Sequence, residues 1–236
     1  MRILQPILTT CILLLTLSAT NAQTVDDIID KNISATGGRD AWKKITSMRQ
    51  EGEIDANGTK IAIRLEAVQD KGVRQTMQVA GMSGWVITTP DKGWSFFPWQ
   101  GQMKAEAMTP EDVSVAQDDM DLQGILVDYK AKGHKAEYLG TDDFEGTECY
   151  KIKITEKSGK IITYYIDPSN YFIIHSETIT RTNGREAHSA SDYSNYKKLP
   201  EGIWMPMTIS AFGSPFKLKK VEINTTIDEN LFKPGI

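Results

Sequence analysis

Cysteine is nearly absent from this chain of 236 residues, which contains only Cys11 and Cys149. Cys11 falls inside an apolar leader, so the rest of the chain has one cysteine and cannot form an internal disulfide. The stretch ECYKI around Cys149 is typical of a β-strand, and a small buried side chain is the expected role of its thiol. A hydrophobic core must therefore hold the fold together.

The chain also lacks an excess of positive charge. It has 27 Lys and Arg against 31 Asp and Glu, and its formal net charge is -4. Nucleic-acid binding requires clustered positive charge, so this class of partner is excluded. A hydrophobic content of 40% with 25% charged residues is that of an ordinary soluble globular protein.

Long apolar runs are missing after the first residues. Arg2 followed by the apolar run 7–17 and the small residues around Ala22 predicts a secretory leader that is cleaved after Ala22. The run is too short to span a bilayer comfortably, and Cys11 lies inside it rather than after it, which argues against lipidation. We therefore expect an exported protein that is not transmembrane.

Familiar catalytic and cofactor signatures are absent as well. The sequence contains no GxSxG motif, no P-loop, no Rossmann fingerprint and no HExxH motif, and we expect neither a metal nor a cofactor. His175 and Glu177 share one face of a predicted strand, and with Asp192 they could form an unrecognised hydrolase site. A solvated strand pair is the preferred interpretation, and we expect no enzymatic activity.

Three helices are predicted. Thr24 and Asp27 form a capping-box pattern at the start of a helix over 24–36, and a short helix over 40–45 follows it. Thr109 before Pro110 predicts the start of a third helix over 109–131. The acidic run 118–121 hints at calcium, but an EF-hand loop would need Glu at its twelfth position, so a solvated helix face is expected.

The remaining sequence has the period of two that β-strands show. Residues 61–65 alternate between apolar and polar side chains, and turn signals such as Asn183-Gly184 recur every ten to fifteen residues. This pattern predicts an antiparallel meander of about ten or eleven strands, without a βαβ rhythm. No composition break is visible, so residues 23–236 are expected to form one domain.

The combined apolar faces of the predicted helices are too narrow to cover so wide a sheet. One face of the sheet could therefore be incompletely filled and form an apolar hollow. Aromatic and methionine side chains suit a surface that accepts varied apolar partners, although ordinary core packing is the alternative for each. The candidate ligand-binding residues are Trp85, Ile87, Trp94, Phe96, Met103, Val113, Met120, Tyr165, Phe172, Ile174, Met205 and Met207.

Four segments carry a resemblance to a known family. ISATGGRDAWKKITSMRQEGEI joins the first helix to the first strand, YYIDPSNYFIIHSE contains an Asp-Pro turn, SDYSNYKKLPEGIWMPMTI forms a late strand pair, and INTTIDENLFKPGI is the last segment. They resemble the LolA-like group, bacterial periplasmic proteins related to the outer-membrane lipoprotein-sorting carrier. None of these segments is catalytic.

The resemblance implies a mainly β fold, an open and strongly curved antiparallel half-barrel whose helices cover its concave face. It also implies a periplasmic carrier that binds lipoprotein acyl chains or other lipids and exchanges them with lipoprotein-handling proteins of the inner and outer membranes. Relatives of this fold sense lipid-related signals, so a sensing or scaffold module with a self-filled hollow is the alternative. In the carriers a particular arginine holds the lid helices closed over the hollow. Arg49, Arg64 and Arg74 are the candidates for this role here.

Overall fold

The fold is mainly β, and the part of the chain that the structure describes forms thirteen antiparallel strands in a single open sheet. The structure, a computed structural model, describes residues 23–56, 58–211 and 213–235, so the predicted leader 1–22 with Cys11 lies outside the described residues. The strands are β1 (Ser47–Ala56), β2 (Thr59–Val68), β3 (Gly72–Val79), β4 (Met82–Thr88), β5 (Gly93–Phe96), β6 (Glu106–Ala107), β7 (Lys135–Phe144), β8 (Thr147–Thr155), β9 (Ile161–Ile166), β10 (Ile173–Thr182), β11 (Arg185–Lys198), β12 (Trp204–Ala211) and β13 (Ser214–Ile223).

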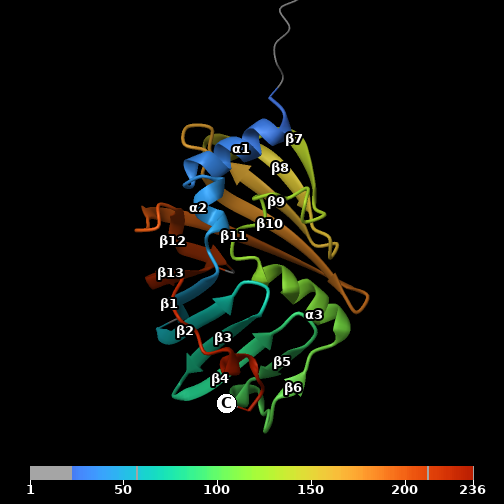
Figure 1. Ribbon diagram of the computed structural model, residues 1–236, viewed down its shortest axis with the longest axis vertical. Coiled ribbons are helices and arrows are strands. Elements are labelled where there is room, and N and C mark those ends of the chain that lie inside the picture. Colours follow the sequence, from blue (N-terminus) through green and yellow to red (C-terminus); the bar gives the residue numbers. More distant parts are fainter. Residues whose placement is uncertain (1–22, 57, 212, 236) are drawn as a thin grey trace, which may run out of the picture.

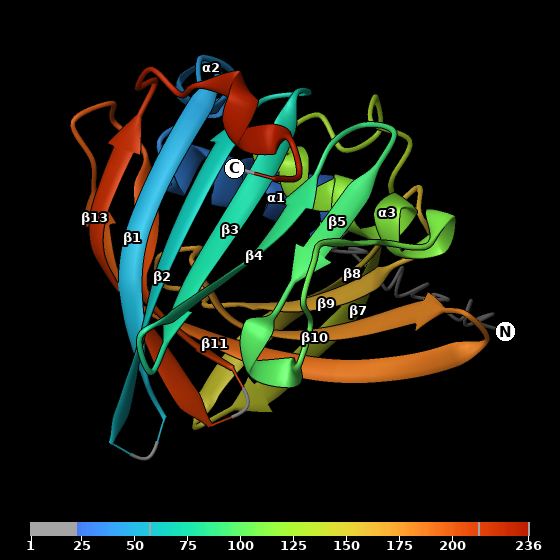
Figure 2. The same cartoon turned by 90° about the horizontal axis from the view of Figure 1, so that it is seen from below.

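The strand order brings the first and last strands together in the middle of the sheet. It reads β6-β5-β4-β3-β2-β1-β13-β12-β11-β10-β9-β8-β7. From β6 at one edge the chain passes through residues 117–134, here called the crossing segment, and resumes at β7 on the other edge. Figure 2 shows strands β1–β5 and β7–β11 as two sides, with α1 and α3 between them.

This architecture confirms the predicted open half-barrel with helices on its concave face. The sequence predicts about ten or eleven strands, which is at least two fewer than the thirteen strands of the structure. The strands β5 and β6 have four and two residues, which is too short for a period of two to be recognised in the sequence. The open sheet has two edges, and the chain itself connects them through the crossing segment.

The helices are α1 (Val25–Ala35), α2 (Arg39–Lys43) and α3 (Pro110–Ala116), and short 3-10 helices are η1 (Pro98–Gln100), η2 (Gln117–Met120) and η3 (Glu229–Phe232). The predicted capping box is present, since Thr24 and Asp27 exchange hydrogen bonds. Figure 1 shows α1 across one end of the sheet. Its residues Ile28 and Ile29 pack with Ile152 and Ile154 of β8, so this face of the sheet is the inner face.

The prediction of one long helix over 109–131 is wrong. The α-helix ends at Ala116, continues as the 3-10 helix η2, and gives way to turns. Gly124 and Asp128 adopt positive φ angles of 86° and 52°, which a right-handed helix does not allow. The crossing segment still packs on the inner face, because Met120 and Leu122 contact Met48 and Val73.

The outer face of β3–β5 is covered by residues near the C-terminus. Ile227 and Phe232 join Trp85 and Ile87 in a buried cluster, and a Cβ atom on Gly72 would lie 2.8 Å from the ring of Phe232. Burial of these apolar side chains stabilises the fold by about 2 kcal/mol each. The sheet therefore has apolar clusters on both faces at this end.

A candidate ligand-binding hollow on the inner face

A partly open cavity of about 220 Å³ lies on the inner face, bordered by α1, α2, the crossing segment and strands β9–β12. Five consecutive residues of the crossing segment, 123–127, form one wall. The fifteen lining residues are Asn32, Ile33, Thr36, Trp42, Gln123, Gly124, Ile125, Leu126, Val127, Tyr164, Ile173, Tyr193, Tyr196, Trp204 and Pro206. None of these fifteen is Asp, Glu, His, Lys or Arg, so this described wall is uncharged and rich in aromatic rings.

Three tyrosines bring hydroxyl groups to this wall without adding charge. The Tyr193 hydroxyl lies 2.9 Å from the hydroxyl of Ser176, and the Tyr196 hydroxyl donates to the carbonyl of Ile173 at 2.7 Å. Burial raises the pKa of Tyr164, Tyr193 and Tyr196 above the ordinary value near 10. All three stay neutral at physiological pH, and the wall offers apolar rings with a few fixed polar atoms, as small-molecule sites do.

The structure places four of the predicted site residues together on the outer face of β4 and β5. Ile87 pairs with Arg74, whereas the neighbouring Val73 packs on the inner face, so Ile87 and Trp85 point outward. Trp94 and Phe96 pair with them on β5 and pack against the same outer cluster. Trp94 and Phe96 therefore lie under the C-terminal residues, and Trp99 of the same aromatic stretch packs against Gly84, also away from the cavity.

The other eight predicted residues are divided. Val113 and Met120 are buried on the inner face, and Met205 packs against the same cluster as Met120. The ring of Phe172 stacks 4.4 Å from that of Tyr196, at the edge of the cavity. The remaining four are Tyr165, buried on the outer face beside Phe144 and His175, Met103, which is 94% exposed, and the half-buried Ile174 and Met207.

None of the twelve is among the fifteen lining residues, but several lie next to one in sequence. Tyr164, Ile173 and Trp204 line the cavity, and the prediction named Tyr165, Ile174 and Met205 instead. Tyr165 lies on the opposite face of its strand from Tyr164, because side chains alternate between the two faces. On β8 the sequence does indicate which side chains point inward. The apolar Ile152 packs on the inner face, and its neighbours Lys151 and Lys153 point outward.

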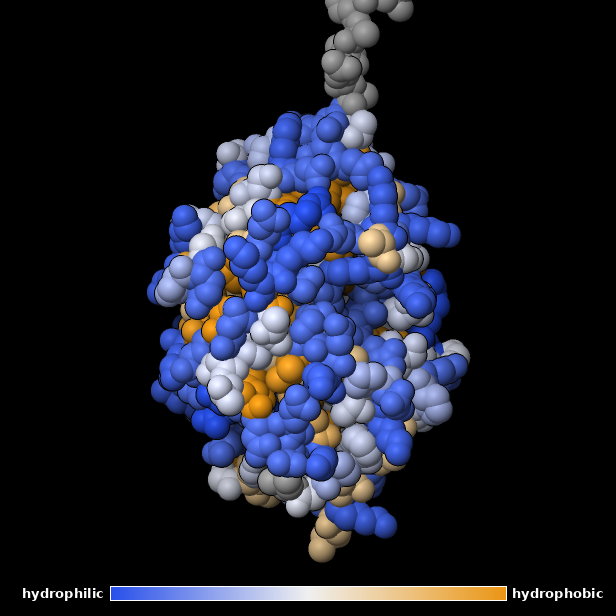
Figure 3. Space-filling model, viewed as in Figure 1, coloured by the Kyte–Doolittle hydropathy of each residue, from blue (hydrophilic) through white to orange (hydrophobic). Residues whose placement is uncertain are grey.

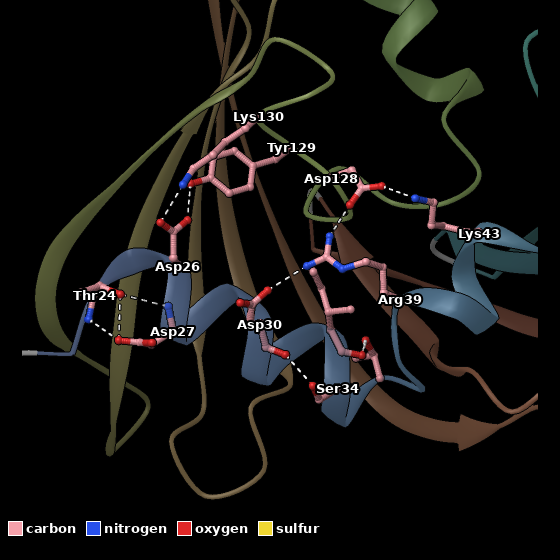
Figure 4. Close-up of polar contacts among 12 residues, drawn as sticks. Thr24, Asp26, Asp27, Asp30, Ser34, Arg39, Lys43, Asp128, Tyr129 and Lys130 are labelled. Atoms are coloured by element: carbon pink, nitrogen blue, oxygen red, sulfur yellow. Dashed lines mark hydrogen bonds and ion pairs between the residues drawn. The ribbon is translucent and has the colours of Figure 1, made fainter.

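Polar contacts fasten the crossing segment to the first two helices (Figure 4). Asp128 accepts hydrogen bonds from Arg39 and from Lys43, the latter at 2.6 Å, and Arg39 also bonds Asp30 of α1 at 2.8 Å. The pKa of Asp128 is lowered by Lys43 and then by Arg39. These four residues, called the clasp, lie next to the wall residues 123–127 and hold the segment over the cavity.

A second set of contacts lies one residue further along the crossing segment. The Tyr129 hydroxyl donates to Asp26 at 2.6 Å, and the ammonium group of Lys130 lies 2.7 Å from the same carboxylate. The two bonds lower the pKa of Asp26, with the contact to Lys130 contributing most. Figure 3 shows apolar residues on this side of the molecule only in separate patches between hydrophilic ones.

The arginine contacts differ from those expected for lid control. Arg49 bonds Glu66 at 3.0 Å, Arg64 pairs with Glu51 at 3.0 Å, and the Arg74 guanidinium lies over the ring of Trp85. Among the arginines that the structure describes, Arg39 forms an ion pair with the crossing segment, at Asp128. No sequence motif marks it, since its partners are 9 and 89 residues away.

The clasp yields a test of how the cavity is closed. Asp128→Asn removes the charge that Arg39 and Lys43 share, while Asn tolerates the positive φ angle at this position at least as well as Asp. Because these ion pairs are partly exposed, we expect an unchanged thermal midpoint. For the lipid binding that is proposed below, we expect the exchange of a fluorescent fatty acid, measured by stopped flow, to become several-fold faster. Asp142→Asn, which removes an exposed ion pair with Lys151 at the far side of the sheet, should leave exchange unchanged.

The alternative hydrolase residues do come together, on the outer face. His175 Nδ1 lies 2.6 Å from Asp192, its ring stacks on Phe144 at 4.2 Å, and the Tyr165 hydroxyl lies 3.3 Å from Glu177.

Burial raises the pKa of the Cys149 thiol, as expected for a structural cysteine. Among the described residues, no three His, Cys, Asp or Glu side chains are placed to hold a metal ion.

Comparison with solved structures identifies the fold. A LolA superfamily protein from Nitrosomonas europaea matches with a TM-score of 0.58 and 13% identity over 90% of this chain and 99% of that chain. A domain from Vibrio parahaemolyticus described as an outer membrane lipoprotein-sorting protein domain matches with a TM-score of 0.53 and 16% identity, over 88% and 95% of the two chains. A DUF1329 family protein from Desulfovibrio piger matches with a TM-score of 0.55 and 13% identity, over 90% and 98%.

These likenesses confirm the resemblance to the LolA-like group at the level of fold. No family model matches the sequence, and no curated protein matches it either. Among the helices that the structure describes, none combines the length and apolar character needed to traverse a bilayer. The function must accordingly be argued from the cavity and its surroundings.

Proposed function

We propose that this chain is a periplasmic, non-enzymatic carrier that binds the acyl chains of lipoproteins or other lipids and passes them toward the outer membrane. The observation that carries the proposal is the uncharged, aromatic-walled cavity beneath a segment held by exposed ion pairs. The predicted leader, cleaved after Ala22, would deliver the protein to the periplasm. Lipoprotein-handling proteins of the two membranes are the proposed partners.

The size of the cavity indicates how a lipid would enter. About 220 Å³ exceeds the roughly 150 Å³ of a cavity that holds benzene, but it is below the roughly 300–1,000 Å³ of most ligand sites. A whole acyl chain therefore requires the crossing segment to move away. The inner-face residues Val113, Met120, Phe172 and Met205 would then contact the longer ligand.

The energetics suit a carrier that must also release its cargo. Each buried methylene contributes about 0.8 kcal/mol, so a chain of about sixteen carbons gains roughly 10 kcal/mol before other costs. Displacing Leu126 and Val127, which are buried in the closed form, offsets part of that gain. The closed segment thus competes with the lipid for the same inner face.

The test is titration of delipidated protein with cis-parinaric acid, a fluorescent fatty acid. We expect saturable binding that Ile173→Trp weakens at least tenfold, because the indole would fill the cavity. Ile179→Trp is the matched control, since Ile179 lies on the same strand at a position facing outward. Absence of saturable binding, or equal affinities for the two variants, would contradict the proposal.

A second candidate is a sensing or scaffold module whose hollow is filled by its own residues. It is favoured by the extent of native packing on the inner face, where Ile28, Ile33 and Leu126 are all nearly fully buried. Mass spectrometry of the protein purified from its own cells distinguishes the two. Co-purified lipid in stoichiometric amount supports the carrier, and a lipid-free complex with another protein supports the module.

A further inference from the structure

A buried carboxyl group lies beneath the start of the crossing segment. The side chain of Glu156, just after β8, has no exposed surface, and no hydrogen bond within the described chain reaches either oxygen. The nearest cation is the Lys160 ammonium, 3.3 Å from Oε1. A buried ionised carboxylate without hydrogen bonds is costly, so this environment favours the protonated form.

Charged groups face Glu156 from several elements. Lys160 lies 3.7 Å from Asp118 and 3.8 Å from Asp119, both in η2, and Asp118 accepts a 2.5 Å hydrogen bond from the hydroxyl of Ser158. The predicted solvated face for the acidic run is therefore wrong for Asp118, which is 14% exposed. A cleft of about 190 Å³ adjoins Glu156, and its other titratable lining residues are Asp70, Asp118, Asp121, Lys132 and His134.

The carboxyl groups around Lys160 outnumber the cations, so binding a proton reduces the excess of negative charge. Asp121 is neutralised by Lys132, whose ammonium also donates to the carbonyl of Gly124 at 2.8 Å. Lys160 alone faces three carboxyl groups, from Asp118, Asp119 and Glu156. With all three ionised the group carries a net charge of about -2, and the most buried carboxyl, Glu156, is the one expected to keep a proton.

We propose that Glu156, Asp118 and Lys160 form a proton-dependent latch that holds the crossing segment closed when Glu156 is protonated and loosens it when Glu156 ionises. Ionisation places two carboxylates against each other, one on the β8–β9 hairpin and one on η2. Movement of η2 away from the hairpin relieves that repulsion and lets water reach Glu156. The consequence for lipid uptake rests on the proposed function, whereas the latch itself is tested without ligand.

The direction of the pH dependence follows from the proton affinities. Burial, followed by the interaction with Asp118, raises the pKa of Glu156 to about 8 from an ordinary value of 4.5. The open form regains the ordinary value, so opening becomes easier as pH rises from about 4.5 to about 8 and levels off above it. Burial lowers the pKa of His134, which disfavours a positive charge on this imidazole beside the cleft.

Amide hydrogen exchange of the full chain, corrected for intrinsic rates, tests the latch between pH 6 and pH 8. The two pKa values limit the change in opening to roughly fiftyfold. We expect protection of the amides of 117–127 to fall at least tenfold in the wild type and less than twofold in Glu156→Gln, which mimics the protonated form. Glu148→Gln, an exposed position on β8, should behave as wild type.

Two results would overturn the latch. One is a wild-type protection that stays flat over this range or falls equally in Glu156→Gln. The other is an equal loss of protection at Ile152 and Ile154 in the core of β8, because the opening would then be global rather than confined to the crossing segment.

Discussion

Trp42→Ala should lower the stability of the ligand-free protein by about 2–4 kcal/mol and increase the stabilisation that an apolar ligand provides. The indole of Trp42 lines the cavity and packs against both inner-face clusters, and its Nε1 donates to the carbonyl of Thr36 at 3.2 Å. Its removal leaves a larger void, and large-to-small changes in a core cost the lost burial and the cavity together. The half-buried position places the loss below that of a fully buried tryptophan.

The measurement is thermal unfolding with and without a saturating fatty acid. The loss corresponds to a fall in Tm of roughly 5–15 °C for a domain of this size. Ligand bound only by the native state raises Tm, and the larger cavity of the variant should make that rise exceed the wild-type rise. Trp99→Ala is the matched control, because Trp99 packs against Gly84 on a part of the sheet that does not line the cavity. This variant should be less stable than the wild type, and the ligand should raise its Tm no more than it raises the wild-type Tm. A ligand response identical in both variants would show that Trp42 does not occupy the ligand's place.

Much of the fold could be predicted because its signals are local. The capping box of Thr24 and Asp27 lies within four residues, and the alternation on β2 lies within residues 61–65. The curvature of the sheet is not local, since it depends on β13 pairing with β1 more than 160 residues away. The sequence did not predict that pairing, and the curved half-barrel was expected through the resemblance to the LolA-like group.

The site could be predicted far less well, for two physical reasons. The faces of a strand differ by one residue, and clusters of apolar residues such as Tyr164-Tyr165 or Phe172-Ile173-Ile174 do not reveal which residue points inward. The outer cluster of Trp85 and Ile87 adds to the ambiguity, because the C-terminal residues make that face apolar as well.

The ion pairs around the crossing segment could not be predicted from the sequence for a different reason. Arg39 and Asp128 are 89 residues apart, and Asp118 and Lys160 are 42 apart, so neither pair forms a pattern along the chain. Each depends on how the crossing segment lies over the inner face, which the prediction of a continuous helix over 109–131 misplaced. Ion pairs of this kind become visible only once the topology is known.

Glu156→Gln should stabilise the protein at neutral pH and have little effect at pH 4.5. With a pKa of about 8 in the folded chain and 4.5 in the unfolded chain, stability from the bound proton is fully present below pH 4.5 and is lost as pH rises toward 8. Each pKa unit corresponds to about 1.4 kcal/mol, and relaxation around the site reduces the total, so we expect a gain of about 1–3 kcal/mol at pH 7.5. Urea unfolding at pH 4.5, 6 and 7.5 measures it.

The shape of that pH dependence separates a proton effect from a packing effect. A gain of equal size at pH 4.5 and 7.5 would mean that the amide simply packs better than the carboxyl. A loss at every pH would mean that Glu156 is ionised in the folded protein and bound by Lys160, since the variant would then leave a buried ammonium with less compensation. Only a difference that grows between pH 4.5 and 7.5 agrees with a carboxyl that carries its proton while the crossing segment is closed.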